Sequence, residues 1–337
     1  MALTRRDLIR TGATLGLTGS ALSVTTFTAG ATGEPKPKVW TTAQWAARPP
    51  KEPIEVLART PTYIVVHHTA TKNSEDLSKE QAFKLSRAIQ TYHMDSRGWI
   101  DSGQQFTNSR GGHLTEGRHR SLEIVGDGAH HVRGAHVANR NSEVIGIENE
   151  GTYTTVDMPK AQWDSLVDLV TFIARQYKIK PSEICGHRDF ANTQCPGDVL
   201  YKRLPELREV VGERLAVPVA QPKFWPLLRP GDTGPKVLAA QHLLRDRGER
   251  DVPTDGVFGP STFAAMSRFA RSAGLPDEPC YATAVADESG LIGGAAWPLL
   301  IRQVDPRGDS DAAKAARALS AEGPVVETQD WRALLHG

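Results

Sequence analysis

The chain has 337 residues, and 39% of them are apolar. Its length exceeds the usual size of one compact domain and therefore predicts two domains and a tail. Its 40 Lys and Arg residues are nearly balanced by 39 Asp and Glu residues. This balance excludes the strong positive field of a nucleic-acid-binding protein, so nucleic acid is not an expected partner.

Residues 1–31 have the pattern of an export signal peptide. The pair Arg5 and Arg6 precedes a weakly apolar stretch without charges, which closes on small residues from Ala29 to Ala31. Two arginines ahead of a mild apolar stretch are typical of a twin-arginine signal, and an ordinary Sec signal is the alternative. The stretch is too poor in large aliphatic residues for a membrane span. We therefore expect a mature chain that has no membrane span and works outside the cytoplasm.

An α/β domain is expected over residues 60–213, after a Pro-rich, irregular lead-in segment at 32–59. The apolar run 63–66 predicts a buried strand, and residues 145–150 predict another strand that emerges at a site. Amphipathic segments lie between the predicted strands, and strands that alternate with helices define this class of domain.

The strongest predicted helix of the chain lies between Trp163 and Tyr177. Its apolar residues recur at helical spacing, so they form one continuous face. Pro159 stands near its start and Pro181 just beyond its end, and both are typical positions for proline at the ends of a helix.

A second, smaller domain is expected after a linker at residues 214–226. In residues 227–301, two Gly-containing turns each lead into a short segment with apolar residues at helical spacing. This pattern predicts a small all-α unit in which two short helices are joined by a Gly turn. A weaker echo of the same pattern in residues 302–337 predicts either a degenerate second repeat or a tail.

The main candidate for chemistry is a set of His and Cys residues. His187 and Cys195 lie eight positions apart on a loop that contains Gly and Pro, so the loop can bring both side chains to one point. Imidazole and thiolate both suit zinc, and His67 or His68 at the end of the first strand can supply a third ligand. Three protein ligands leave a position for water, which is typical of a catalytic zinc site. By spacing alone, packed histidines and an inert buried cysteine remain the alternative.

Several motifs occur together in one order along the chain. They are Trp45–Pro50, Ile64–Ala70, His93–Met94, Gly98–Asp101, Glu116–Arg118, Gly134–His136, Asn141, Ile145–Ile147, Gly186–Asp189 and Thr193–Gly197. With them the sequence resembles the N-acetylmuramoyl-L-alanine amidases of the peptidoglycan-recognition-protein type (amidase type 2), which include the phage lysozyme amidases. Any one motif is weak, but the ordered set is specific.

The resemblance implies a mixed central sheet flanked by helices, with Zn²⁺ in a groove. It implies His67, the first of the pair, as a metal ligand together with His187 and Cys195. The implied reaction is zinc-dependent hydrolysis of the amide bond between N-acetylmuramic acid and L-alanine in peptidoglycan. Peptidoglycan, both glycan strand and stem peptide, is then the expected partner of a monomeric enzyme that is secreted or associated with the cell wall.

Further catalytic residues follow from the same resemblance. Glu148 falls at the position of a general base in a related bacterial branch, and Glu150, two residues on, shares its face of the strand. Thr193 matches a position that stabilises the oxyanion. Gln104 stands where the family has a tyrosine, so here an amide that can donate a hydrogen bond replaces a phenol that can also act as an acid.

Substrate contacts are expected from His136, Asn141, Trp99 and Arg118, which lie in the matching motifs. The segment 227–301 resembles a three-helix peptidoglycan-binding domain, whose role is to hold an enzyme on its polymeric substrate.

Two other functions are compatible with the same pattern. One is a recognition module that binds peptidoglycan without cutting it, although such proteins typically lack a metal ligand, and here all three positions are filled. The other is a zinc peptidase that cuts within the stem peptide.

The pairing of the three cysteines is left open by the sequence. Cys185 and Cys280 can form a disulfide or stay separate, whereas a Cys185–Cys195 disulfide would destroy the metal site.

Overall fold

The computed structural model describes residues 36–276, 287–302, 304–305 and 307–322. The predicted export signal and Cys280 lie outside these residues and stay predictions. In the described part of the chain, no helix is both long and apolar enough to cross a membrane.

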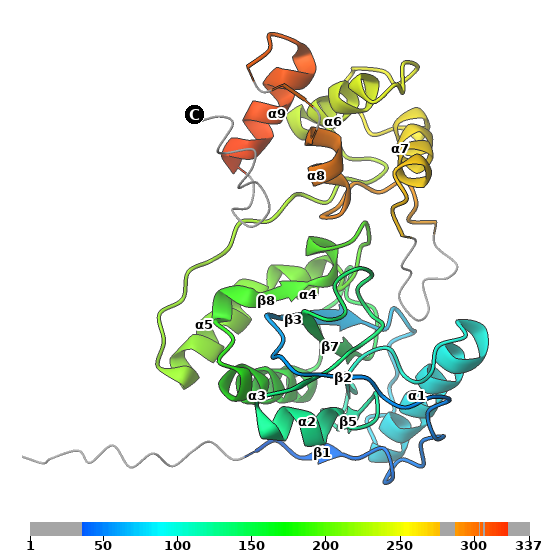
Figure 1. Cartoon of the computed structure of the whole chain (residues 1–337), viewed down its shortest axis with the longest axis vertical. Helices are drawn as coiled ribbons and strands as arrows, with labels where there is room; N and C mark the ends of the chain where they lie inside the picture. Colours follow the sequence, from blue (N-terminus) through cyan, green and yellow to red (C-terminus); the bar gives the residue numbers. More distant parts are fainter. Residues whose placement is uncertain (1–35, 277–286, 303, 306, 323–337) are drawn as a thin grey trace, which may run out of the picture. The chain divides into compact units, whose positions relative to one another are not determined.

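A mixed sheet of six strands, in the order β1-β5-β4-β7-β3-β8, forms the centre of the α/β domain (Figure 1). Its strands are β1 (Val39–Trp40), β3 (Tyr63–His68), β4 (Phe106–Asn108), β5 (Leu114–Glu116), β7 (Val144–Asn149) and β8 (Ile184–Gly186). β3 lies between β7 and β8 and runs parallel to both, β4 runs parallel to β7, and β4 pairs antiparallel with β5. The predicted mixed central sheet is therefore confirmed.

The lead-in segment contributes two short strands. β1 pairs parallel with β5 at the edge of the main sheet, while β2 (Val56–Leu57) pairs antiparallel with β6 (His131–Val132). Each of these strands has two residues, which is too short to show the alternation by which a strand is recognised in a sequence.

Helices flank this sheet. They are α1 (Lys79–Thr91), α2 (Ser121–Asp127), α3 (Lys160–Tyr177), α4 (Asp198–Lys202) and α5 (Leu204–Leu215), with a π-helical turn at Tyr92–Ser96 and 3-10 turns at Pro181–Glu183 and His187–Asp189. Figure 1 shows α3 and α5 side by side along the sheet. The predicted helix between Trp163 and Tyr177 is confirmed as α3.

The main core of the α/β domain lies between the sheet and these two helices. Ile64, Val66, Ile145 and Ile147 point into it from β3 and β7, and the apolar face of α3 covers them. Because successive side chains of a strand point to opposite faces, the intervening residues of β3 and β7 face the other side of the sheet. That second side carries the candidate site.

The rest of the described chain forms a helical domain, named here from Leu227 to Glu322. Its helices are α6 (Pro235–Asp246), α7 (Pro260–Ser272), α8 (Ala296–Ile301) and α9 (Asp311–Glu322). They share one apolar core, to which α9 belongs although it lies in the segment expected to be a degenerate repeat or a tail. The linker ends inside this domain, because the ring of Trp225 stacks on Trp297 at 6.1 Å between centroids.

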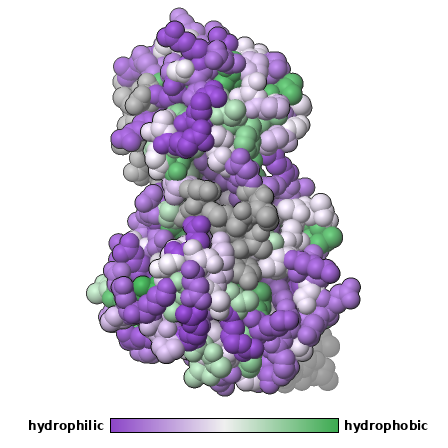
Figure 2. Space-filling model, turned by 90° about the vertical axis from the view of Figure 1, so that its right-hand side faces the viewer, coloured by the Kyte–Doolittle hydropathy of each residue, from purple (hydrophilic) through white to green (hydrophobic). Residues whose placement is uncertain are grey.

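The described residues from Lys36 onward belong to a single compact unit. The face shown in Figure 2 is mostly hydrophilic, with hydrophobic residues scattered between the polar ones.

Candidate metal centre

Strand alternation decides between the two neighbouring histidines of β3. Val66 points into the core under α3, so Val65 and His67 face the opposite side of the sheet, while His68 returns to the side of the core. There His68 Nδ1 accepts a hydrogen bond from the backbone N–H of Tyr153 at 3.3 Å. The His67 side chain therefore faces the candidate site, whereas the His68 side chain has a structural role as an acceptor for the backbone of Tyr153.

The register of four neighbouring strands aligns polar side chains in one row. Thr107 of β4 is paired with Glu148 of β7, and Glu148 is paired with His67 of β3. Val66 is paired with Gly186 of β8, so His187 follows next to His67. The carboxyl ends of these parallel strands thus bring together residues as far apart in the chain as His67 and His187, which are separated by 120 positions.

The three predicted ligands meet at the end of this row. One nitrogen of His67, one of His187 and the Sγ atom of Cys195 lie within 4.8 Å of one another, and all three residues are buried. Cys195 Sγ lies 3.7 Å from His67 Nδ1. A nitrogen and a sulfur bound to one tetrahedral zinc ion are about 3.5 Å apart. The donor types and their separation therefore fit a zinc ion.

The electrostatics of the site also suit a metal. Burial, and after it the neighbouring imidazoles, hold the pKa of His67 well below its usual value, so the ring is neutral and can offer a lone pair.

Neither Cys185 nor Cys195 forms a disulfide, so the competing Cys185–Cys195 pairing is wrong. Burial raises the pKa of the Cys185 thiol well above its usual range, which makes this second cysteine unreactive.

The loop that carries two of the ligands, residues 187–198, is here named the ligand loop. Its two ends are joined by a hydrogen bond from Arg188 N–H to the carbonyl of Cys195 at 2.9 Å. The Cys195 N–H donates to Thr193 Oγ1 at 3.1 Å, and the Arg188 guanidinium bonds Asp198 Oδ1 at 2.9 Å. These contacts hold the cysteine beside His187, as the spacing of eight predicted.

His136 lies directly behind His67. His136 Nδ1 is 3.0 Å from His67 Nε2, and its ring packs on Gly146, where a Cβ atom would come within 2.5 Å of it. His67 Nδ1 lies on the side of Cys195, so a metal bound at Nδ1 would leave the proton on Nε2, and the Nε2–H group would then donate a hydrogen bond to His136 Nδ1. A second hydrogen bond of this kind fixes the ring and tautomer of a metal-binding histidine. The resemblance also implies that His136 contacts substrate, and that role stays a prediction.

We expect His136→Ala to lower the zinc affinity about 10- to 100-fold, because His67 loses the partner that fixes its orientation. Competition with a chromogenic chelator measures the affinity. His130→Ala is the matched control, since His130 is exposed and pairs only with neighbouring Asp127 among the described residues. Equal affinity for His136→Ala and the control would show that this hydrogen bond does not support the site.

The structure separates the two carboxylates Glu148 and Glu150. Glu148 Oε1 lies 3.9 Å from His67 Nδ1, and burial raises the pKa of Glu148 to about 8. Its Oε2 makes no hydrogen bond within the described residues. Glu150 instead accepts hydrogen bonds from Gln81 Nε2 at 2.8 Å and from Arg110 N–H at 2.9 Å. Glu148 is therefore the carboxylate that faces the ligands, while Glu150 joins α1 to a neighbouring loop.

Gln104 and Thr193 flank the row from different segments. Gln104 Nε2 donates to Thr107 Oγ1 at 2.9 Å, and Thr107 is the register partner of Glu148. Thr193 is buried, and because its oxygen accepts the Cys195 N–H, its hydroxyl proton can be donated elsewhere. Both side chains keep a donor for a group in the site, and their catalytic roles stay predictions.

The other expected substrate contacts have structural partners. Asn141 Oδ1 accepts the N–H groups of His136 and Val137, so it shapes the loop that holds His136. Buried Arg118 donates to the carbonyls of Ser102 and Arg133.

Trp99 packs its ring on His93 at 4.5 Å between centroids and is partly exposed. Part of the surface of Trp99 is therefore open to a ligand. Substrate binding by Asn141, Trp99 and Arg118 stays a prediction.

Comparisons with known proteins relate this chain to one family. A family model described as N-acetylmuramoyl-L-alanine amidase matches residues 57–198. Peptidoglycan-recognition protein SC2 of Drosophila simulans is 33% identical over 144 residues, which cover 42% of this chain and 72% of that protein. Human N-acetylmuramoyl-L-alanine amidase is 29% identical over 170 residues, which cover 50% of this chain and 28% of that protein. A solved structure of Drosophila PGRP-LB aligns with a TM-score of 0.44 and 28% identity, covering 50% of this chain and 92% of that one.

A mixed sheet with one histidine on β3, a second directly after β8 and a cysteine on the following loop defines an α/β protein with a candidate metal centre. The chain belongs to the family of N-acetylmuramoyl-L-alanine amidases and peptidoglycan-recognition proteins. The matched residues 57–198 include the three candidate ligands.

Proposed function

We propose that this protein is a zinc-dependent N-acetylmuramoyl-L-alanine amidase, which hydrolyses the amide bond between N-acetylmuramic acid and L-alanine in peptidoglycan. The observation that carries the proposal is the meeting of His67, His187 and Cys195 donor atoms within 4.8 Å, with Glu148 next to them. A recognition module needs only a binding surface, whereas a hydrolase needs ligands and a proton acceptor in one place.

His67, His187 and Cys195 would hold the zinc ion, and Zn²⁺ bound there would supply Lewis-acid chemistry that polarises a carbonyl and acidifies water. Glu148 accepts the proton of the attacking water at Oε2 and later returns it to the amine of the leaving L-alanine. Thr193 and Gln104 donate hydrogen bonds to the oxygen that becomes negative when the carbonyl is attacked. His136 keeps His67 in the tautomer that a ligand requires.

The proposal also covers where the enzyme works and what the helical domain does. Peptidoglycan lies outside the cytoplasm, and the predicted signal in residues 1–31 accounts for export of a secreted or wall-associated enzyme. The helical domain is proposed to bind peptidoglycan and so to raise the effective concentration of substrate at the metal centre.

Product analysis of digested sacculi tests the proposed reaction. We expect free amino groups of L-alanine and glycan strands without stem peptides, both abolished by a zinc chelator and restored by Zn²⁺. Release of other amino-terminal residues would instead support a zinc peptidase. Binding of sacculi without any product, at full zinc occupancy, would support a recognition module.

A further inference from the structure

The helical domain approaches the backbone of the ligand loop very closely at two glycines. A Cβ atom on Gly293 would lie 2.4 Å from the carbonyl oxygen of Ala191, and one on Gly294 would lie 2.1 Å from that of Asp189. These distances are far below any normal contact, and the obstacle is backbone, which cannot swing aside as a side chain can. The Gly294 N–H also donates to the Arg188 carbonyl at 3.0 Å. Only residues without a side chain permit this approach.

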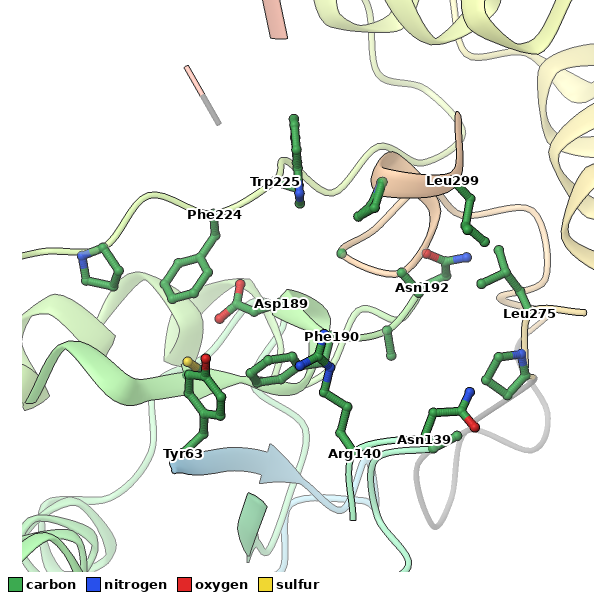
Figure 3. A pocket seen from close by; sticks show the side chains of 18 of the residues that line it. Tyr63, Asn139, Arg140, Asp189, Phe190, Asn192, Phe224, Trp225, Leu275 and Leu299 are labelled. Carbon is green, nitrogen blue, oxygen red and sulfur yellow. The ribbon is translucent and has the colours of Figure 1, made fainter. Parts of the chain in front are cut away.

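A loop side chain reaches into the helical domain at the same place. Asn192 Oδ1 accepts the N–H groups of Gly293 at 3.0 Å and Ala296 at 3.1 Å, where α8 begins. Figure 3 shows Asn192 beside the short helix that carries Leu299, at the rim of a cavity of about 300 Å³. The contact therefore continues from backbone to side chain along the loop.

Two charged residues of the helical domain bond the loop next to the cysteine ligand. Glu288 is buried, and its Oε1 accepts the N–H of Gln194 at 3.1 Å. Arg229 donates to Gln194 Oε1 at 3.1 Å and also forms an ion pair with Asp198. These contacts fall on both sides of Cys195, at the preceding residue and three residues beyond.

We propose that Arg229, Glu288 and the Gly293–Gly294 pair are positioning residues for the metal centre, through which the helical domain fixes the loop that presents Cys195. A cysteine ligand on a loop is useful only if its backbone is fixed, and groups outside the direct ligands typically set metal affinity in this way. The consequence for zinc rests on the proposed function, but the positioning of the thiol does not. The helical domain then serves the site itself and does more than tether the enzyme to a polymer.

The test uses the full chain with single substitutions. Arg229→Ala removes the contacts to Gln194 and Asp198, and Glu288→Ala removes the acceptor of the Gln194 N–H. Glu288→Gln is the conservative variant, because its Oε1 can still accept that hydrogen bond. Arg268→Ala is the matched control, since Arg268 forms a half-exposed ion pair with Glu249 inside the helical domain.

The first readout is the rate at which iodoacetamide alkylates Cys195 in the metal-free protein, followed by peptide mass spectrometry. We expect Arg229→Ala and Glu288→Ala to raise this rate about tenfold, and Glu288→Gln and Arg268→Ala to leave it unchanged. The second readout is zinc affinity by chelator competition, with an expected loss of about tenfold in the same two variants. Thermal unfolding confirms that each variant is folded, and Arg229→Ala, at a partly exposed site, remains informative if Glu288→Ala does not fold.

Unchanged alkylation and unchanged zinc affinity in folded Arg229→Ala would overturn the proposal, as would equal effects of Arg268→Ala. The proposed function can fail separately. If the unsubstituted protein binds no zinc but alkylation still rises in the variants, the positioning stands and the metal centre is wrong.

Discussion

Replacement of Cys195 by alanine is expected to abolish amide hydrolysis and most zinc binding. The substitution removes one of three ligands, and the Lewis-acid contribution of several kcal/mol that depends on them corresponds to a loss of about a thousandfold or more in rate. Metal content by elemental analysis and release of L-alanine amino groups from sacculi measure the two effects.

Cys185→Ala is the matched control for this experiment. Cys185 is also buried and forms no disulfide, but it lies on β8 and is not among the residues that share the metal position. We expect it to keep zinc and activity, with some loss of stability because a buried side chain is truncated. Hydrolysis by Cys195→Ala at an undiminished rate would show that the ligand set is wrong.

Replacement of Glu148 by glutamine is expected to lower kcat about 10²- to 10⁴-fold while zinc content stays the same. Glutamine preserves the shape of the side chain but cannot accept a proton, and loss of a general acid–base costs a factor of this size. The measurement is kcat on a soluble muropeptide, together with zinc content of the same sample.

Glu150→Gln distinguishes this role from a general effect of buried charge. Glu150 is also buried, but its carboxylate accepts hydrogen bonds from Gln81 and from the backbone N–H of Arg110. Its substitution should lower the unfolding temperature and change kcat by no more than a few-fold. If Glu150→Gln loses activity and Glu148→Gln retains it, the assignment of the two carboxylates is reversed.

Two inner strands of the sheet, β3 and β7, could be predicted because their apolar runs are local patterns. The run at 63–66 extends to His68 as β3, and the strand expected at 145–150 is β7, shifted by one residue. The spacing of His187 and Cys195 indicated that a short loop could bring them together, and the structure places them so. By spacing alone the choice between His67 and His68 remained open, because it depends on which face of β3 the helix α3 covers.

The contacts that support the site could not be predicted in the same way. His136 lies 69 positions from His67, and the strand that carries Thr107 has three residues, too few to show a period. Arg229, Glu288 and Gly294 act across more than 30 positions of sequence, and nothing near them in the chain indicates a partner. Such pairs become visible only when the fold brings them together.

The row formed by Thr107, Glu148 and His67 has a consequence for the evolution of the site. Each side chain belongs to a different strand, and a slip of one residue in any of them would exchange a reactive group for a core group. The buried aliphatic residues that fix the register of these strands therefore also fix the alignment of Thr107, Glu148 and His67. A chain that pairs its strands incorrectly is both misfolded and inactive, so selection for a stable sheet preserves the arrangement of the reactive groups at the same time.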